Sequence, residues 1–128
     1  MPSRSEGAHE ILLRVDPGRR RLGWPVGLRD GALLALIAAG LTPREISRLR
    51  ASAITMIRGN LLVAVQRQGV TWYAVLPSEI GGWLLAWVTE RRLWAEGVPV
   101  FQGLNGRPLP PNRIEKIIER YRRQRRAR

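Results

Sequence analysis

The side chains best equipped for chemistry in this sequence are its guanidinium groups. Of the 22 basic residues, 21 are arginine and one is lysine, Lys116. A guanidinium group is a planar, permanently charged fork with five N–H donors, so it binds phosphate oxygens and guanine edges well. Arginine in place of lysine is also typical of a GC-rich genome. The total charge is therefore stronger support for phosphate binding than the choice of residue.

Other reactive side chains are scarce. The chain has no cysteine and a single histidine, His9, which lies in a polar N-terminal stretch. A thiol nucleophile, a disulfide and a zinc site of cysteine and histidine ligands are therefore excluded, and we expect neither a metal nor a cofactor. Tyr73 lies in an alternating strand pattern and Tyr121 in an amphipathic helix pattern. Both tyrosines are expected to have structural roles.

The charge is large and unevenly distributed. The formal net charge is +12, and residues 111–128 hold eight basic and two acidic residues, which gives +6, half of the total. This charge favours an anionic polymer as partner, nucleic acid ahead of a membrane surface. The longest apolar run, 32–39, has eight residues, far short of the ~20 that span a bilayer. The N-terminus lacks the apolar stretch of a secretory signal, so a cytoplasmic protein without a membrane partner is expected.

The apolar pattern predicts one α+β domain, mainly helical, with a small sheet. With 128 residues, 45% of them hydrophobic, the chain is long enough for a single core. Residues 1–27 are predicted to be irregular, residues 28–123 to form the domain and residues 124–128 to form a basic tail. The predicted helices are 28–39, 43–50, 80–95 and one from about residue 112, and the predicted strands of a three-stranded antiparallel sheet are 54–57, 61–67 and 70–76.

A tight corner is predicted between the first two helices. The first helix is apolar nearly all round, which is typical of a deeply buried helix, and Gly40-Leu41 ends it. Thr42 is then predicted to cap the second helix. Pro43 at the first helical position and Glu45 at the third complete a Thr-x-x-Glu capping box.

The order of these elements resembles the opening half of the catalytic domain of tyrosine recombinases, the phage integrase family. Helix, Gly-Leu corner, short helix and hairpin follow one another from residue 29 and end in Val75-Leu76-Pro77. Phe101 and the later Gly106-Arg107-Pro108-Leu109 are similar to the family's junction before a DNA-facing helix. The resemblance extends to about Arg123 and implies a DNA-binding fold.

The resemblance also implies that the family's chemistry is missing here. Those enzymes attack a phosphodiester with a tyrosine and stabilise the phosphorus intermediate with arginines, a lysine and histidine-type donors. Thr42 stands where the family carries its first catalytic arginine, although the acidic residue three positions later is retained as Glu45. The hairpin lysine position falls on Arg67 or Gln68, and the family's His-x-x-Arg box and nucleophilic tyrosine belong after the last predicted helix. We therefore expect no catalytic residue and no enzymatic activity.

Arg44 is the arginine nearest to the lost catalytic position. A shift of two residues along a helix rotates a side chain by roughly 200°. Arg44 is therefore expected to lie on the face opposite to Thr42 and not to replace the missing guanidinium group.

Tryptophans are the other prominent side chains. Trp83, Trp87 and Trp94 form one stripe of the predicted helix 80–95. A core or a subunit interface is favoured for this stripe over base stacking, because stacking platforms usually lie on exposed basic sheets. Trp72, in the hairpin and near Arg67, is placed where it can touch a nucleic-acid backbone.

These features predict a protein that binds double-stranded DNA and resembles a truncated, inactive recombinase with an accessory or regulatory role in recombination or integration. A recombinase or a second copy of the chain is a further candidate partner. The predicted DNA-contacting residues are Arg48, Arg50, Arg67, Asn112, Arg113, Lys116, Arg120, Arg122 and Arg123, with Asn112 and Arg113 as the candidates for reading base edges.

Two alternatives stay open. The chain can be half of an enzyme that a second polypeptide completes, or an interaction module that docks through its tryptophan stripe. A helix-turn-helix regulator, suggested by residues 41–46, is less favoured because such domains do not continue into a β-ribbon.

Overall fold

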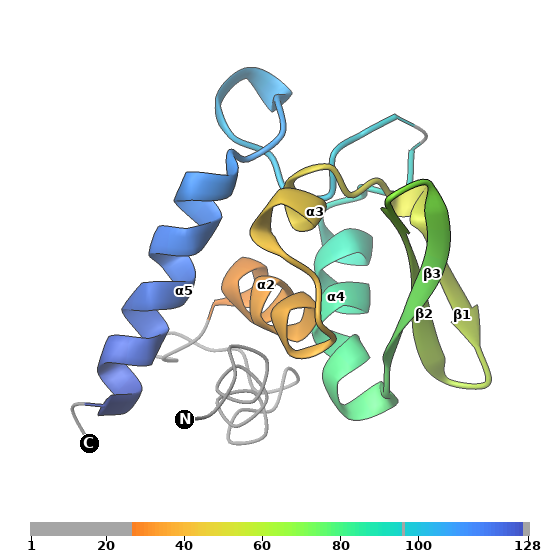
Figure 1. The fold of residues 1–128 in the computed structure, drawn as a ribbon, viewed down its shortest axis with the longest axis horizontal. Coiled ribbons are helices and arrows are strands. Elements are labelled where there is room, and N and C mark those ends of the chain that lie inside the picture. Colours follow the sequence, from red (N-terminus) through yellow and green to blue (C-terminus); the bar gives the residue numbers. More distant parts are fainter. Residues whose placement is uncertain (1–26, 96, 127–128) are drawn as a thin grey trace.

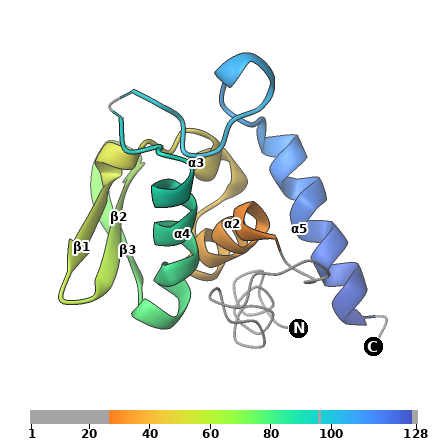
Figure 2. The same cartoon turned by 180° about the vertical axis from the view of Figure 1, so that it is seen from behind.

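The computed structural model describes residues 27–95 and 97–126. They form an α+β domain, which confirms the predicted fold class. The elements in chain order are α2 (Leu28–Ala38), α3 (Pro43–Ser47), η2 (Ala51–Ala53), β1 (Ile54–Ile57), β2 (Asn60–Arg67), β3 (Val70–Leu76), α4 (Ser78–Glu90), η3 (Leu104–Gly106) and α5 (Pro111–Arg126). The sheet, α4, α2 and α5 lie in succession across the molecule, and α3 lies at one end of these layers (Figure 1; Figure 2).

Helix α2 is the centre of the core. Residues 32–37 are at most 1% exposed, as the apolar pattern predicts. The helix ends in a Schellman motif, in which Leu41 N–H donates to Leu36 O and Gly40 N–H donates to Ile37 O, both at 3.0 Å. Gly40 has φ +101°, a conformation that suits glycine because it has no Cβ.

The predicted capping box at the start of α3 is confirmed. Glu45 N–H donates to Thr42 Oγ1 at 3.2 Å, and Thr42 N–H donates to Glu45 Oε1 at 2.9 Å. The predicted end of the helix at Arg50 is wrong, because α3 ends at Ser47. Arg50 is extended and bridges to Pro99, so the chain leaves the helix early in order to pair with a distant segment.

The sheet is a three-stranded antiparallel meander in the order β1-β2-β3, as predicted. Two-residue turns join its strands at Arg58-Gly59 and Gln68-Gly69, and all four residues have positive φ. This pattern is the type I′ turn, whose twist matches that of paired strands. Leu61, Val63 and Val65 of β2 are buried, so one face of the sheet contributes to the core.

Helix α4 is packed between the sheet and α2 (Figure 1). Its predicted end at residue 95 is wrong, because it ends at Glu90. A second Schellman motif follows: Leu93 N–H donates to Val88 O at 2.9 Å, and Arg92, with φ +55°, donates to Thr89 O at 3.2 Å. The reversal buries Leu93, and this burial offsets the cost of a left-handed arginine.

Helix α5 is amphipathic. Ile114, Ile117, Ile118 and Tyr121 are buried against the rest of the domain. The helix continues to Arg126, so the basic tail predicted from residue 124 begins inside a helix. Except for Gly27, the segment predicted to be irregular, 1–27, lies outside the described residues. Within the described ranges, no helix combines the length and apolar character needed to cross a membrane.

Candidate nucleic-acid interface

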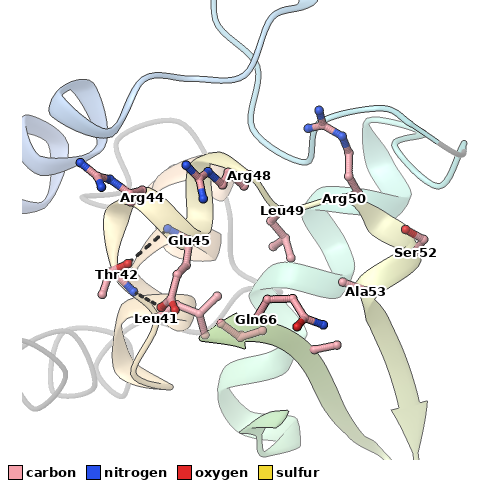
Figure 3. A pocket seen from close by; sticks show the side chains of 12 residues that line it. Leu41, Thr42, Arg44, Glu45, Arg48, Leu49, Arg50, Ser52, Ala53 and Gln66 are labelled. Atoms are coloured by element: carbon pink, nitrogen blue, oxygen red, sulfur yellow. Dashed lines mark hydrogen bonds between the residues drawn. The ribbon is translucent and has the colours of Figure 1, made fainter. Parts of the chain in front are cut away.

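A cavity of about 630 Å³ lies between α3, η2 and β2. Figure 3 shows the side chains of Arg44, Arg48 and Arg50 along its upper side, with Leu49 and Gln66 below them. Three arginines and the carboxylate of Glu45 thus border a cavity that also contains apolar side chains such as Leu49. Its lining residues are Leu41, Thr42, Arg44, Glu45, Arg48, Leu49, Arg50, Ser52, Ala53, Ala64, Val65 and Gln66.

Arg44 and Thr42 line the same cavity, and the expectation that Arg44 does not replace the missing guanidinium group stays a prediction. Thr42 is the N-cap residue, with extended backbone angles of φ −84° and ψ 159°. The helical rotation of about 100° per residue therefore does not apply between these two positions. Arg44 is thus a cation of this site, although its spacing from Thr42 along the chain does not indicate it.

Arg67, a predicted DNA contact, is bound within the protein. Its Nε donates to Glu45 Oε2 at 2.6 Å, and its Nη2 donates to Glu45 Oε1 at 2.7 Å and to Gly40 O at 2.8 Å. The guanidinium carbon also lies 3.8 Å from the centroid of the Trp72 ring. Arg67 therefore joins the hairpin to the corner beside Thr42, and Trp72 supports it from the strand alongside.

The same contacts change the ionisation of Glu45. Hydrogen bonds from Arg67, aided by those from Thr42, hold the pKa of Glu45 below its ordinary value of 4.5, although partial burial acts in the opposite direction. The folded state therefore binds fewer protons than the unfolded state in this pH range. Stability from Glu45 is fully present above pH 4.5 and is lost as the pH falls through the lowered pKa.

Glu45→Gln is expected to lower the free energy of unfolding by about 1–2 kcal/mol at pH 7, because the bidentate ion pair with Arg67 is lost. The difference between variant and wild type should shrink as the pH falls from 4.5 through the folded-state pKa of Glu45. Urea unfolding at pH 7 and at pH 3 measures it. Glu79→Gln, which removes an exposed carboxylate of α4, is the matched control and should change stability less. A Glu45→Gln deficit that is equal at both pH values would contradict this account.

Four basic residues of α5 form one exposed row. Arg113, Lys116, Arg120 and Arg123 recur at intervals of three and four residues, on the side opposite the buried isoleucines. We call this row the α5 ridge. No ion pair within the described residues involves Arg113 or Lys116, and Asn112 is exposed beside them.

The other predicted DNA contacts on α5 form ion pairs within the domain. Arg120 Nη2 lies 2.9 Å from Asp30 Oδ2, although 55% of its side chain is exposed. Arg122 lies off the ridge: its side chain is 25% exposed, and Nη1 is 3.5 Å from Glu119 Oε2. Arg123 is 78% exposed, and its Nε atom lies 3.9 Å from Glu119 Oε1. An ion pair this long and exposed is weak, so Arg123 can leave Glu119 to bind a phosphate.

Helices α3 and α5 are packed together, which brings the cavity and the ridge to neighbouring elements. Buried Ser47 of α3 donates its hydroxyl to Leu109 O at 2.7 Å, just before α5 begins. Arg44 and Arg48 on α3 are exposed, as are Arg113 and Lys116 on α5. We use the name α3–α5 face for the exposed polar and basic side chains of these two helices, namely these four residues with Asn112, Arg120 and Arg123. Arg50 is half-buried, and its Nη1 atom is enclosed without a hydrogen-bond partner among the described residues.

The two tyrosines have different environments. Tyr121 is buried and its hydroxyl donates to Asp30 Oδ2 at 2.5 Å. Burial, followed by the hydrogen bond to Asp30, raises the pKa of Tyr121 to about 12, as suits a residue that holds α5 in place. Tyr73 lies in β3 and is 60% exposed, so its expected structural role stays a prediction.

The tryptophan stripe is not one surface. Trp83 is fully buried, whereas Trp94 lies beyond the end of α4 and is 45% exposed. Trp87 is half-buried, stacks on Phe101 with ring centroids 6.2 Å apart, and donates its indole N–H to Val100 O at 2.9 Å. Two of the three tryptophans thus belong to the packing of the domain. Little of the stripe is exposed for the docking that the interaction-module hypothesis requires.

The described ranges contain no cluster of three or more His, Cys, Asp or Glu side chains that could hold a metal ion.

Comparison with known proteins identifies the fold. No protein-family model matches this sequence, and no curated protein is significantly similar to it. Among solved structures, the chain is similar to the XerH site-specific recombinase in its pre-cleavage complex with its difH substrate, with a TM-score of 0.70 and 20% sequence identity. The likeness covers 97% of this chain and 35% of the recombinase chain.

The chain therefore has a recombinase-like α+β fold, as the resemblance predicts. It spans about a third of the length of the XerH chain. At 20% identity the similarity concerns the fold; activity, substrates and partners do not follow from it.

Proposed function

We propose that this chain binds double-stranded DNA through the α3–α5 face and does not cut it. The observation that carries the proposal is a set of exposed cations, Arg44 and Arg48 on α3 and Arg113 and Lys116 on α5, for which the described residues supply no ion-pair partner. The similarity to a recombinase whose structure contains its DNA substrate adds support. Such a protein would serve as an accessory or regulatory factor in recombination or integration.

The arrangement of charges suits a duplex backbone. The α5 ridge runs along a helix from Arg113 to Arg123, ten residues or about 15 Å at 1.5 Å per residue. Duplex DNA carries one negative charge per about 1.7 Å of axis. A ridge of this length can therefore follow several phosphates, while Asn112 and Arg113 at the helix start are placed to approach base edges.

A lack of cleavage is proposed from the side chains near the corner. Thr42 carries a hydroxyl where the related enzymes carry an arginine, and Arg67 is held by Glu45 and Gly40. Tyr121 is buried on Asp30 with a raised pKa, which makes it a poor nucleophile. These features support a binding role over strand cleavage.

Removing two cations of the α3–α5 face is the direct test. Arg113→Ala/Lys116→Ala is expected to weaken duplex binding about tenfold at 0.1 M salt and to reduce the slope of log K against log salt by about 2. Fluorescence anisotropy with labelled duplexes of several sequences at four salt concentrations measures both. The wild-type slope should be about −5 if five or six phosphates are contacted.

Arg58→Asn is the control for loss of a cation outside the α3–α5 face. It removes one cation at the β1–β2 turn, far from α5 in Figure 1 and Figure 2, and asparagine tolerates the positive φ of this position. Its salt slope should equal that of the wild type. Equal slopes for the wild type and the double variant would refute binding through the α3–α5 face.

A trans-completed enzyme is the second candidate function. The observation that favours it is that the chain spans only 35% of the recombinase chain that it resembles. A nicked suicide substrate incubated with this chain alone should yield no covalent protein–DNA adduct. An adduct with this chain alone would overturn the proposed lack of cleavage, and an adduct only after a partner polypeptide is added would establish the second candidate.

A further inference from the structure

The connection between α4 and α5 projects beyond the helices and presents an apolar side chain. Figure 1 and Figure 2 show this loop extending past the start of α5 at one end of the molecule. Leu104, in η3 of this loop, is 89% exposed. This is the highest exposure among the large hydrophobic side chains of the described residues.

Several contacts hold the loop in shape. Gly103 N–H donates to Arg107 O at 2.7 Å, and a bridge joins Gln102 and Pro108. Asn105 and Gly106 have φ of +60° and +73°, values that asparagine and glycine adopt at low cost. The loop thus forms a small closed hairpin with Leu104 at its tip.

The base of the hairpin is fixed to the core. Phe101 is fully buried and Leu109 is 5% exposed, and Leu109 N–H donates to Phe101 O at 2.9 Å. Leu109 O also accepts the buried hydroxyl of Ser47. Because the loop is closed at its tip and anchored at its base, the fold holds the apolar Leu104 side chain in solvent.

The charges around the tip restrict its partner. Residues 97–114 contain no acidic residue. Asn105 and Arg107 flank the tip and are exposed, and the α5 ridge begins at Arg113. A partner for this tip should combine anionic groups with an apolar interior. Duplex DNA does so, with phosphates outside and stacked base faces within.

We propose that Leu104 acts as a wedge that enters a base step of bound duplex DNA from the minor groove and kinks it. Apolar wedges of this kind bend duplexes by about 20–90° and are accompanied by Arg and Asn contacts in the groove. Arg107 supplies the adjacent phosphate contact, and Asn105 faces the base edges. The inference rests on the proposed DNA binding, and adds to it a defined deformation of the DNA.

The test compares the wild type with Leu104→Ala and Leu104→Met in the full-length chain. A 30-bp duplex labelled at both ends reports bending by energy transfer, and anisotropy reports affinity. The wild type should raise the transfer efficiency. Leu104→Ala should abolish the rise and weaken binding about five- to tenfold while leaving the salt slope unchanged, because it removes apolar contact and no charge. Leu104→Met keeps a long apolar side chain and should still bend the duplex.

The possible results separate this inference from the proposed function. Binding without bending, or equal bending by the wild type and Leu104→Ala, overturns the wedge and leaves DNA binding intact. An absence of duplex binding by the wild type overturns both. Co-sedimentation with phosphatidylglycerol vesicles that Leu104→Ala abolishes, without an effect on DNA bending, assigns the tip to a membrane surface and also overturns the wedge. Thermal unfolding should be the same for all three proteins because residue 104 is exposed.

Discussion

Gly31→Ala is expected to destabilise the protein by about 4 kcal/mol or to prevent folding. A Cβ atom at residue 31 of α2 would lie 1.9 Å from Cε3, 2.4 Å from Cζ3 and 2.6 Å from Cδ2 of Trp83 in α4. Carbon atoms in contact lie about 3.5–4.0 Å apart. Trp83 is fully buried and has no space to turn aside, so the two helices would have to separate. Urea unfolding followed by circular dichroism measures the loss.

Two further variants isolate this contact. Gly81→Ala, in α4, places its Cβ 3.1 Å from Leu76 O and 3.3 Å from the Leu61 side chain. Gly81→Ala should lower the free energy of unfolding much less than Gly31→Ala does, because the neighbouring atoms need to move by only tenths of an ångström. Gly31→Ala/Trp83→Leu should be less unstable than the sum of its single changes, because the smaller side chain makes room for the new methyl group. Near-wild-type stability of Gly31→Ala would contradict the close crossing of α2 and α4.

The parts of the fold that depend on neighbouring residues are predictable from the sequence. The two type I′ turns follow from Arg58-Gly59 and Gln68-Gly69, and the start of α3 follows from the capping box at Thr42. The burial of α2 follows from its apolar surface. In each case the physical cause lies within a few residues along the chain.

Helix ends that depend on distant packing were not predictable. Helix α4 ends where Arg92 adopts a left-handed conformation, and an arginine gives no sign of this, whereas Gly40 does. The buried position of Leu93 supplies the cause. Similarly, α3 ends early because Leu49 and Arg50 pair with residues 99–100, and Val100 N–H donates to Leu49 O at 3.0 Å.

The candidate interface was predictable in part for the same reason. Helical spacing places Arg113 and Lys116 on one exposed face of an amphipathic helix, because the buried isoleucines define the other face. The partner of Arg67 is 22 positions away along the chain, and spacing does not reveal such a pair. Neither does it reveal the exposure of Leu104, which depends on how the loop around it closes.

Asp30→Ala is expected to cost about 3–4 kcal/mol of the free energy of unfolding. Asp30 is 7% exposed, and its carboxylate joins α2 to α5. Its Oδ2 atom accepts the Tyr121 hydroxyl at 2.5 Å and lies 2.9 Å from Arg120 Nη2, while Oδ1 accepts Arg29 Nε at 3.0 Å. Alanine would leave a buried tyrosine hydroxyl unpaired and remove the anion beside two cations. Urea unfolding measures the stability, and hydrogen exchange of α5 amides should show increased opening around Tyr121.

A double-mutant cycle tests whether the loss comes from this network. Tyr121→Phe alone should cost about 1–2 kcal/mol, because Asp30 keeps its two arginines. Asp30→Ala/Tyr121→Phe should be only slightly less stable than Asp30→Ala alone, because phenylalanine leaves no buried hydroxyl without a partner. If the two single losses instead added fully, the hydroxyl and the carboxylate would be acting independently and the network would not hold α5. Because Asp30 binds Arg120 and Tyr121, whereas Arg113 and Lys116 lie nearer the start of the helix, Asp30→Ala should weaken DNA binding less than Arg113→Ala/Lys116→Ala when both are folded.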